Sequence, residues 1–106
     1  MKMELRSKGV QITDGLRSFI EKKLEVALGR FSHRIHRVHV LLTDINGPRG
    51  GEDIRCYIRA NLGSAGGVTI TETRQNAFVA VARASGRVSH HLSRHLSRAH
   101  TGRRSG

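Results

Sequence analysis

The feature that most constrains the fold is an alternation of apolar and polar side chains in residues 54–62. Ile54, Cys56 and Ile58 are apolar, whereas Arg55 and Arg59 stand between or beside them. Because successive side chains of a β-strand point to opposite faces of the sheet, this segment predicts a strand with one buried face and one basic face. The chain is therefore expected to build a sheet that is covered on one side only.

Three further segments have the pattern of strands. Residues 1–8 alternate weakly, residues 37–42 alternate around two valines, and residues 68–73 form a short apolar alternation. Turn-forming residues at 46–51 and 63–67 connect the last three segments. The second, third and fourth strands are thus predicted to follow one another as hairpins, with a long flexible loop at 46–51.

Two segments instead repeat apolar residues every three or four positions, as helices do. The first begins after Thr13, a good helix-capping residue, and ends between residues 29 and 32. The second is expected over about residues 74–98, with Gly86 costing roughly 1 kcal/mol relative to alanine. Its apolar side carries Phe78, Val81, Val88, Leu92 and Leu96.

The order of these elements predicts an α+β fold, a β-α-β-β-β-α two-layer sandwich. The helix after the first strand allows a crossover to a parallel neighbour, and two helices on one face of a four-stranded sheet leave the other face open. A chain of 106 residues has room for one domain, predicted over residues 1–100. Residues 101–106 are expected to be a disordered basic tail.

The charge of the chain points to a polyanionic partner. Nineteen Lys and Arg against eight Asp and Glu give a net charge of +11. The excess lies in the second half, where nine basic residues face a single acid, Glu72. We therefore expect the anion-binding surface to be built mainly from residues after 53.

A basic stripe on the last helix is the strongest candidate for that surface. Cations one helical turn apart can each meet a phosphate along an RNA strand, and no acid follows Glu72. An ordinary solvated helix face is the alternative, but such a face normally mixes signs. The stripe consists of Arg83, Arg87, His90, Arg94 and Arg98, with His91 beside it. His90, His91 and His95 add hydrogen-bond donors that strengthen if the rings are protonated.

The outward face of the third strand is a second candidate. Arg55, Tyr57 and Arg59, with Arg37 and His39 on the preceding strand, can form a platform for RNA, or simply a half-exposed sheet. Since a single aromatic residue supports little base reading, contacts to the RNA backbone and shape are favoured.

Other chemistries have little support in the sequence. Cys56 stands in an apolar alternation and reads as a buried residue, and the histidines lack the carboxylate or cysteine companions of a metal site. No phosphate-binding loop or catalytic set is present. No segment is long and apolar enough for a membrane span. We expect a cytoplasmic protein that is not an enzyme and that has no cofactor, metal, membrane or small-molecule substrate.

Residues 7–17, with the sequence Ser-Lys-Gly-Val-Gln-Ile-Thr-Asp-Gly-Leu-Arg, resemble the start of the ribosome hibernation-promoting factor and ribosome-associated inhibitor family. The resemblance extends to about residue 98 and includes Glu72 and the basic end of the last helix. It implies binding to the small ribosomal subunit and its rRNA, in the channel of messenger and transfer RNA, and inhibition of translation under stress or in stationary phase. By position, the implied RNA-binding residues are Arg87, His90, His91 and Arg94, together with Lys8, Arg17, Lys22 and Lys23.

The chain also departs from the family pattern. Asn76, Ala77 and Phe78 replace the usual Asp-Met-Tyr, Ala82 replaces an Asp, and several lysines are Arg or His. The long family members carry a C-terminal dimerisation domain that this sequence does not contain, so pairing of ribosomes by that route is not expected, and whether the protein promotes or prevents ribosome dimers is left open. A monomer is expected. A general binder of double-stranded nucleic acid is the alternative function.

Overall fold

The computed structural model describes residues 2–47 and 53–105, with side chains as far as Ser97. The predicted loop at 46–51 thus lies mostly outside the described residues. The element order is strand, helix, three strands, helix, and the sheet order is β1-β2-β3-β4. The strands are β1 (Lys2–Lys8), β2 (Arg37–Asp44), β3 (Ile54–Asn61) and β4 (Gly67–Arg74).

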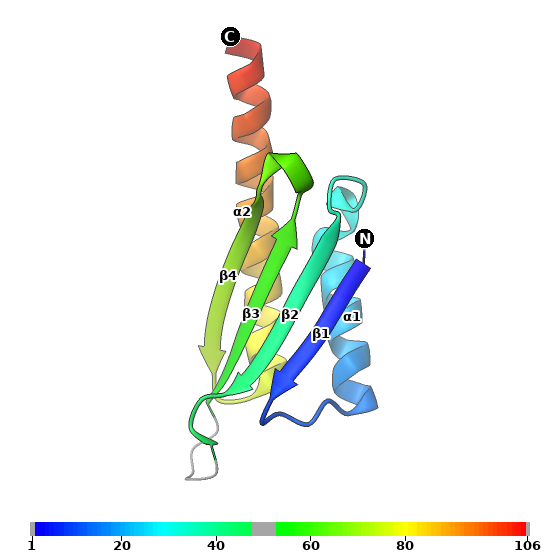
Figure 1. The fold of residues 1–106 in the computed structure, drawn as a ribbon, viewed down its shortest axis with the longest axis vertical. Helices are drawn as coiled ribbons and strands as arrows, with labels where there is room; N and C mark the ends of the chain where they lie inside the picture. Colours follow the sequence, from blue (N-terminus) through cyan, green and yellow to red (C-terminus); the bar gives the residue numbers. More distant parts are fainter. Residues whose placement is uncertain (1, 48–52, 106) are drawn as a thin grey trace.

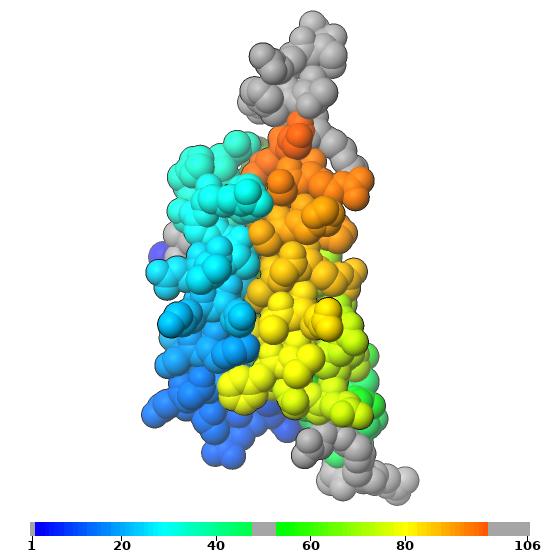
Figure 2. Space-filling view, turned by 180° about the vertical axis from the view of Figure 1, so that it is seen from behind, coloured from blue at the N-terminus to red at the C-terminus, as the bar shows by residue number. Residues whose placement is uncertain are grey.

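The sheet is mixed, as the sequence predicted. β1 pairs with β2 in parallel, and α1 (Asp14–Leu28) makes the crossover between them. β2, β3 and β4 pair antiparallel in succession. Both helices lie behind the sheet in Figure 1 and side by side in Figure 2, so the opposite sheet face is uncovered. The predicted two-layer α+β sandwich is confirmed.

α1 begins and packs as its sequence dictates. The Thr13 hydroxyl oxygen accepts a hydrogen bond from the Leu16 N–H at 3.1 Å, and Asp14 in the first turn suits the positive end of the helix dipole. The buried side chains recur every four residues and face the sheet: Leu16, Ile20, Leu24 and Leu28. A short 3-10 turn, η1 (Gly29–Phe31), ends the helical segment within the predicted range.

α2 (Ala77–Ser105) starts later and ends later than the sequence predicted. β4 continues to Arg74, and Asn76 then caps the helix by accepting the Val79 N–H at 2.9 Å, so helical geometry cannot begin at residue 74. Without a proline to stop it, the helix continues to Ser105, past the expected end at residue 98. The division into a domain of residues 1–100 and a tail stays a prediction.

The core lies between the sheet and the helices. β2 and β3 contribute alternate side chains, and α2 contributes a narrow stripe of small and branched residues: Ala80, Val81, Ala84, Val88 and Leu92. Phe78 was predicted on this apolar side but is 46% exposed. It packs edge-to-face on Phe19 of α1, with ring centroids 5.0 Å apart, because it points between the helices and not at the sheet.

Candidate nucleic-acid interface

The uncovered face of the sheet, here called the open face, is a grid of four rows of side chains. Each row follows the strand register from β1 to β4. One row reads Lys2, Arg37, Asn61, Gly67; the next Glu4, His39, Arg59, Thr69; then Arg6, Leu41, Tyr57, Thr71; and finally Lys8, Thr43, Arg55, Thr73.

The charge of the open face is almost entirely positive. Lys or Arg occupies six of these positions, whereas Glu4 is the only acid among them. The charge of Glu4 is offset by Arg37, because a carboxylate oxygen lies 3.4 Å from an Arg37 guanidinium nitrogen. The other carboxylate oxygen lies 2.9 Å from the ring nitrogen Nδ1 of His39. The face therefore offers cations at several strand positions and little to repel a polyanion.

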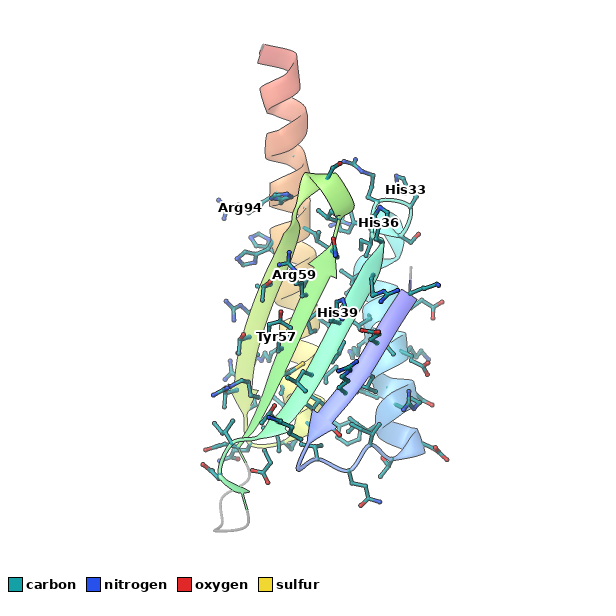
Figure 3. The ribbon with its side chains drawn as sticks, viewed as in Figure 1. His33, His36, His39, Tyr57, Arg59 and Arg94 are labelled. Carbon is teal, nitrogen blue, oxygen red and sulfur yellow. The ribbon has the colours of Figure 1, made fainter. Side chains whose placement is uncertain are left out.

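Arg59 and Tyr57 lie at the centre of the open face. The Arg59 guanidinium donates to the Thr69 hydroxyl on β4 at 2.8 Å. It passes close over Gly67, where an added Cβ would lie 2.9 Å from Nη2 of Arg59 and 2.7 Å from the Ala60 carbonyl oxygen. Only glycine fits at this position, which leaves room for the guanidinium close to β4. Figure 3 shows Tyr57 and Arg59 on the sheet, and Arg94 beyond its β4 edge.

The basic side chains of α2 beside β4, here called the α2 flank, adjoin the open face along that edge. The flank comprises Arg87, His91 and Arg94. It also includes Arg83, which lies one helical turn before Arg87. His90 is exposed on the side of the helix turned away from the sheet, with its ring edge-on to His91. The side chain of Arg98 lies outside the described part of the helix.

Glu72, the only acid of the second half, ties the α2 flank to the sheet. Its side chain is 9% exposed and accepts hydrogen bonds from Arg87 at 2.6 Å and from Arg74. Arg87 also donates to the Thr71 carbonyl oxygen at 3.0 Å. Hydrogen bonds from Arg87, and then from Arg74, hold the pKa of Glu72 below its usual range despite its burial.

Arg87 therefore has a structural role that the sequence did not reveal. Its guanidinium is half exposed, so it still presents positive charge at the surface. However, the adjacent Glu72 carboxylate cancels much of that charge. Arg94 and Arg83 are exposed, and no acidic partner contacts them within the described residues.

The remaining predicted residues lie elsewhere. Lys8 ends β1 on the open face, in the same row as Arg55. Arg17, Lys22 and Lys23 are exposed on α1, in the layer behind the sheet. The structure thus brings Lys8, Arg55 and Arg59 onto one face, places the α2 flank beside it, and leaves the α1 residues apart.

Sequence reasoning missed several basic residues of this surface. Lys2 and Arg6 lie on the open face, and their alternation with Met3 and Leu5 in β1 was the available signal. His95, expected only as an added donor beside the stripe, makes a contact that the sequence did not predict. Its ring Nε2 lies 3.0 Å from the carbonyl oxygen of Ala65, thirty positions earlier in the chain, and no local pattern announces such a contact.

Cys56 lies buried on the helix side of β3, and burial, with a smaller effect of Glu72, raises the pKa of its thiol to about 12. A thiol that stays protonated is a poor nucleophile. Among residues 2–47 and 53–97, no three His, Cys, Asp or Glu side chains gather as metal ligands. Neither helix, over its described residues, is long and apolar enough to cross a membrane.

These features define a class of small α+β proteins with a β-α-β-β-β-α order and an open cationic sheet. A family model described as sigma 54 modulation protein / S30EA ribosomal protein matches residues 3–100. The chain belongs to this family, in agreement with the resemblance seen in the sequence. A comparison with curated proteins gives no significant match.

Solved structures agree with the family assignment. The N-terminal domain of Protein Y from Thermus thermophilus superposes with a TM-score of 0.68 at 26% identity, covering 89% of this chain and 98% of that one. A ribosomal subunit interface protein from Coxiella burnetii gives a TM-score of 0.74, covering 92% and 99%. At 17% identity, the second likeness shows the shared fold alone.

Proposed function

We propose that this protein binds the small ribosomal subunit through its rRNA, in the channel used by messenger and transfer RNA, and thereby inhibits translation under stress or in stationary phase. Membership of the S30EA ribosomal protein family supports a role at the ribosome. The protein acts by occupying space, as a cytoplasmic monomer without a cofactor or a catalytic step.

The observation that carries this proposal is the continuity of positive charge from the open face to the α2 flank. The six Lys or Arg positions of the sheet lie on β1, β2 and β3. Arg59 of β3 links them to the flank, because its guanidinium reaches the Thr69 hydroxyl on β4, and Thr69 lines the same hollow as Arg94 of α2. A surface that turns a corner can contact RNA strands on two sides of a channel. Contacts from such a surface go mainly to phosphates and sugars, which suits recognition of RNA shape.

Co-sedimentation with purified vacant small subunits in a sucrose gradient tests the proposal. At physiological salt the protein is expected to travel with the subunit, and the double variant R55E/R59E is expected to stay near the top. The variant E21Q/E25Q, altered on exposed acids of α1, is the matched control and should still co-sediment. Wild-type protein that stays at the top in the presence of excess subunits contradicts the proposal.

Competition distinguishes this function from general binding to double-stranded nucleic acid. Bulk duplex RNA or DNA in excess should leave the complex with the subunit largely intact, whereas a general binder would be displaced. A salt titration counts the phosphate contacts, because each contributes a slope of roughly 0.7 to 0.9 in log affinity against log salt. Addition of the protein to a translation reaction should lower the yield in proportion to subunit occupancy.

A further inference from the structure

A hollow of about 310 Å³ lies where α2 passes the free edge of β4, at the end of the sheet near the β3–β4 turn. Its walls come from two elements far apart in the sequence. They are Gly67, Val68 and Thr69 of β4, and His91, Arg94 and His95 of α2.

The two histidines of this hollow each have one ring nitrogen already engaged. Nδ1 of His91 lies 2.9 Å from the Arg87 carbonyl oxygen, and Nε2 of His95 lies 3.0 Å from the Ala65 carbonyl oxygen. A carbonyl oxygen only accepts, so in each ring the engaged nitrogen carries the hydrogen. The other nitrogen of a neutral ring is then an acceptor, and it cannot bind an anion until a proton is added.

The β4 edge supplies a further donor. Arg87 donates to the Thr71 carbonyl oxygen from outside the sheet, so the backbone groups of Thr71 point away from β3. In an antiparallel strand the N–H and C=O of one residue point to the same side, and the direction alternates along the strand. The N–H of Thr69, two residues earlier, therefore also points outward, toward the hollow that Thr69 lines.

We propose that this hollow binds one phosphate group of an RNA strand and takes up protons on His91 and His95 as it does so. Arg94 supplies a permanent charge, Thr69 a neutral N–H, and each protonated ring a second N–H. That the phosphate belongs to RNA rests on the proposed function. The binding of a phosphate group in the hollow does not depend on that function. The consequence is tighter RNA binding at mildly acidic pH.

The other charged groups near the two rings do not remove the expected pH dependence of phosphate binding. On α2, His90 lies edge-on to His91, and Arg87 is held by Glu72. On the sheet, Arg59 is bonded to the Thr69 hydroxyl. The arginines keep their charge at every pH considered, whereas imidazole is the kind of side chain that gains a proton between neutral and mildly acidic pH.

NMR titration of the full chain tests the proposal without the ribosome. Sulfate is one probe, because it keeps its charge over this pH range, and the dinucleotide UpU is the other, since it carries a single RNA phosphodiester. Both should shift the Thr69 amide and both histidine rings, and the apparent affinity at about pH 5.5 should exceed that at about pH 8 by about tenfold. Affinity that does not change with pH, or an unmoved Thr69 amide, overturns the proposal.

The double variant H91Q/H95Q keeps a side-chain donor for each carbonyl but cannot take up a proton. It should retain weak binding and lose the pH dependence, whereas the control H33Q, altered in the exposed turn after α1, should behave as wild type. Persistent pH dependence in H91Q/H95Q overturns the assignment. A response to sulfate without one to UpU overturns the RNA source.

The two proposals can fail separately. If the sulfate and UpU titrations succeed but the protein does not co-sediment with small subunits, the hollow is a phosphate site and the ribosomal function is wrong. If co-sedimentation succeeds and is equally strong in H91Q/H95Q at both pH values, with no response of Thr69 to either probe, the ribosomal function stands and the proton-linked site is wrong.

Discussion

α1 and α2 pack side by side on the same face of one sheet, yet their solvent-facing surfaces differ. The exposed positions of α1 mix signs, with Glu21 and Glu25 beside Lys22 and Lys23. α2 exposes basic residues and no acid over its described side chains. α2 is also tied to β4 through Glu72 and to the β3–β4 turn through His95, whereas α1 makes no such polar contact with the described strands.

The two helices share an amphipathic pattern but present different charges to the solvent. Both helices bury an apolar stripe, so burial alone does not distinguish them. What distinguishes α2 is that its charges are of one sign and that one of them, Arg87, is held in position by bonds to β4. A fixed array of like charges repels itself and is stabilised by a polyanion, while a mixed surface such as that of α1 is satisfied by water and its own neighbours.

The largest effect is expected from reversing charge on α2. The variant R83E/R94E leaves the Arg87–Glu72 bond intact and should weaken binding to small subunits roughly 100-fold at low salt, because two attractions become two repulsions. Fluorescence anisotropy with labelled protein measures the affinity, and circular dichroism checks the fold. A loss of less than about threefold would remove α2 from the interface.

The next effect concerns the bond between α2 and the sheet. The variant E72Q removes the carboxylate that Arg74 and Arg87 share, and it should lower the free energy of unfolding by about 1 to 3 kcal/mol. Both arginines are about half exposed and can turn to water, which limits the loss. Urea denaturation measures it, with E21Q on α1 as the control. Equal stability of E72Q and wild type would show that the Glu72 bonds do not hold α2 in place.

The pH dependence of the free energy of unfolding tests the same ion pairs of Glu72. Because the pKa of Glu72 lies below its ordinary value of 4.5 in the folded state, its contribution is present above about that pH and is lost as the pH falls through the folded pKa. The stability difference between wild type and E72Q should therefore shrink toward zero in acid. A difference that is constant from neutral pH to about pH 3 would contradict the assigned ion pairs.

The smallest effect is expected on α1. The variant K22E/K23E reverses as many charges as R83E/R94E but should weaken binding by about threefold or less, through long-range repulsion only. The same anisotropy assay compares the two. A loss equal to that of R83E/R94E would show that the α1 positions suggested by family resemblance contact RNA, and the contrast between the helices would then be wrong.

The fold could be predicted because its signals are local. Alternation in β3 and the four-residue repeat of α1 each lie within one element, and the order of elements then limits the topology. The start of α2 was wrong because strand pairing extends β4 to Arg74, and pairing partners are not visible in a local pattern. Phe78 was misplaced because a helical repeat does not say which of two neighbours, sheet or α1, each side chain meets.

The site was predicted less completely than the fold, because it depends on contacts that no local pattern shows. The basic character of β3 and α2 follows from the sequence, but the joining of these surfaces at the β4 edge depends on contacts between distant residues. Glu72 looked like an isolated acid among cations, and only the fold shows that it organises Arg74 and Arg87. Lys2 and Arg6 join the open face through the parallel pairing of β1 with β2.

The hydrogen bond from Arg87 to the Thr71 carbonyl also bears on self-association. β4 is an outer strand, and its outward N–H and C=O groups are a template on which another chain could add a strand. Arg87 occupies one of these acceptors, and the neighbouring arginine and histidines line the edge with charge and bulk. Arg87 and these neighbours thus make the β4 edge a poor template for the addition of a strand from a second chain.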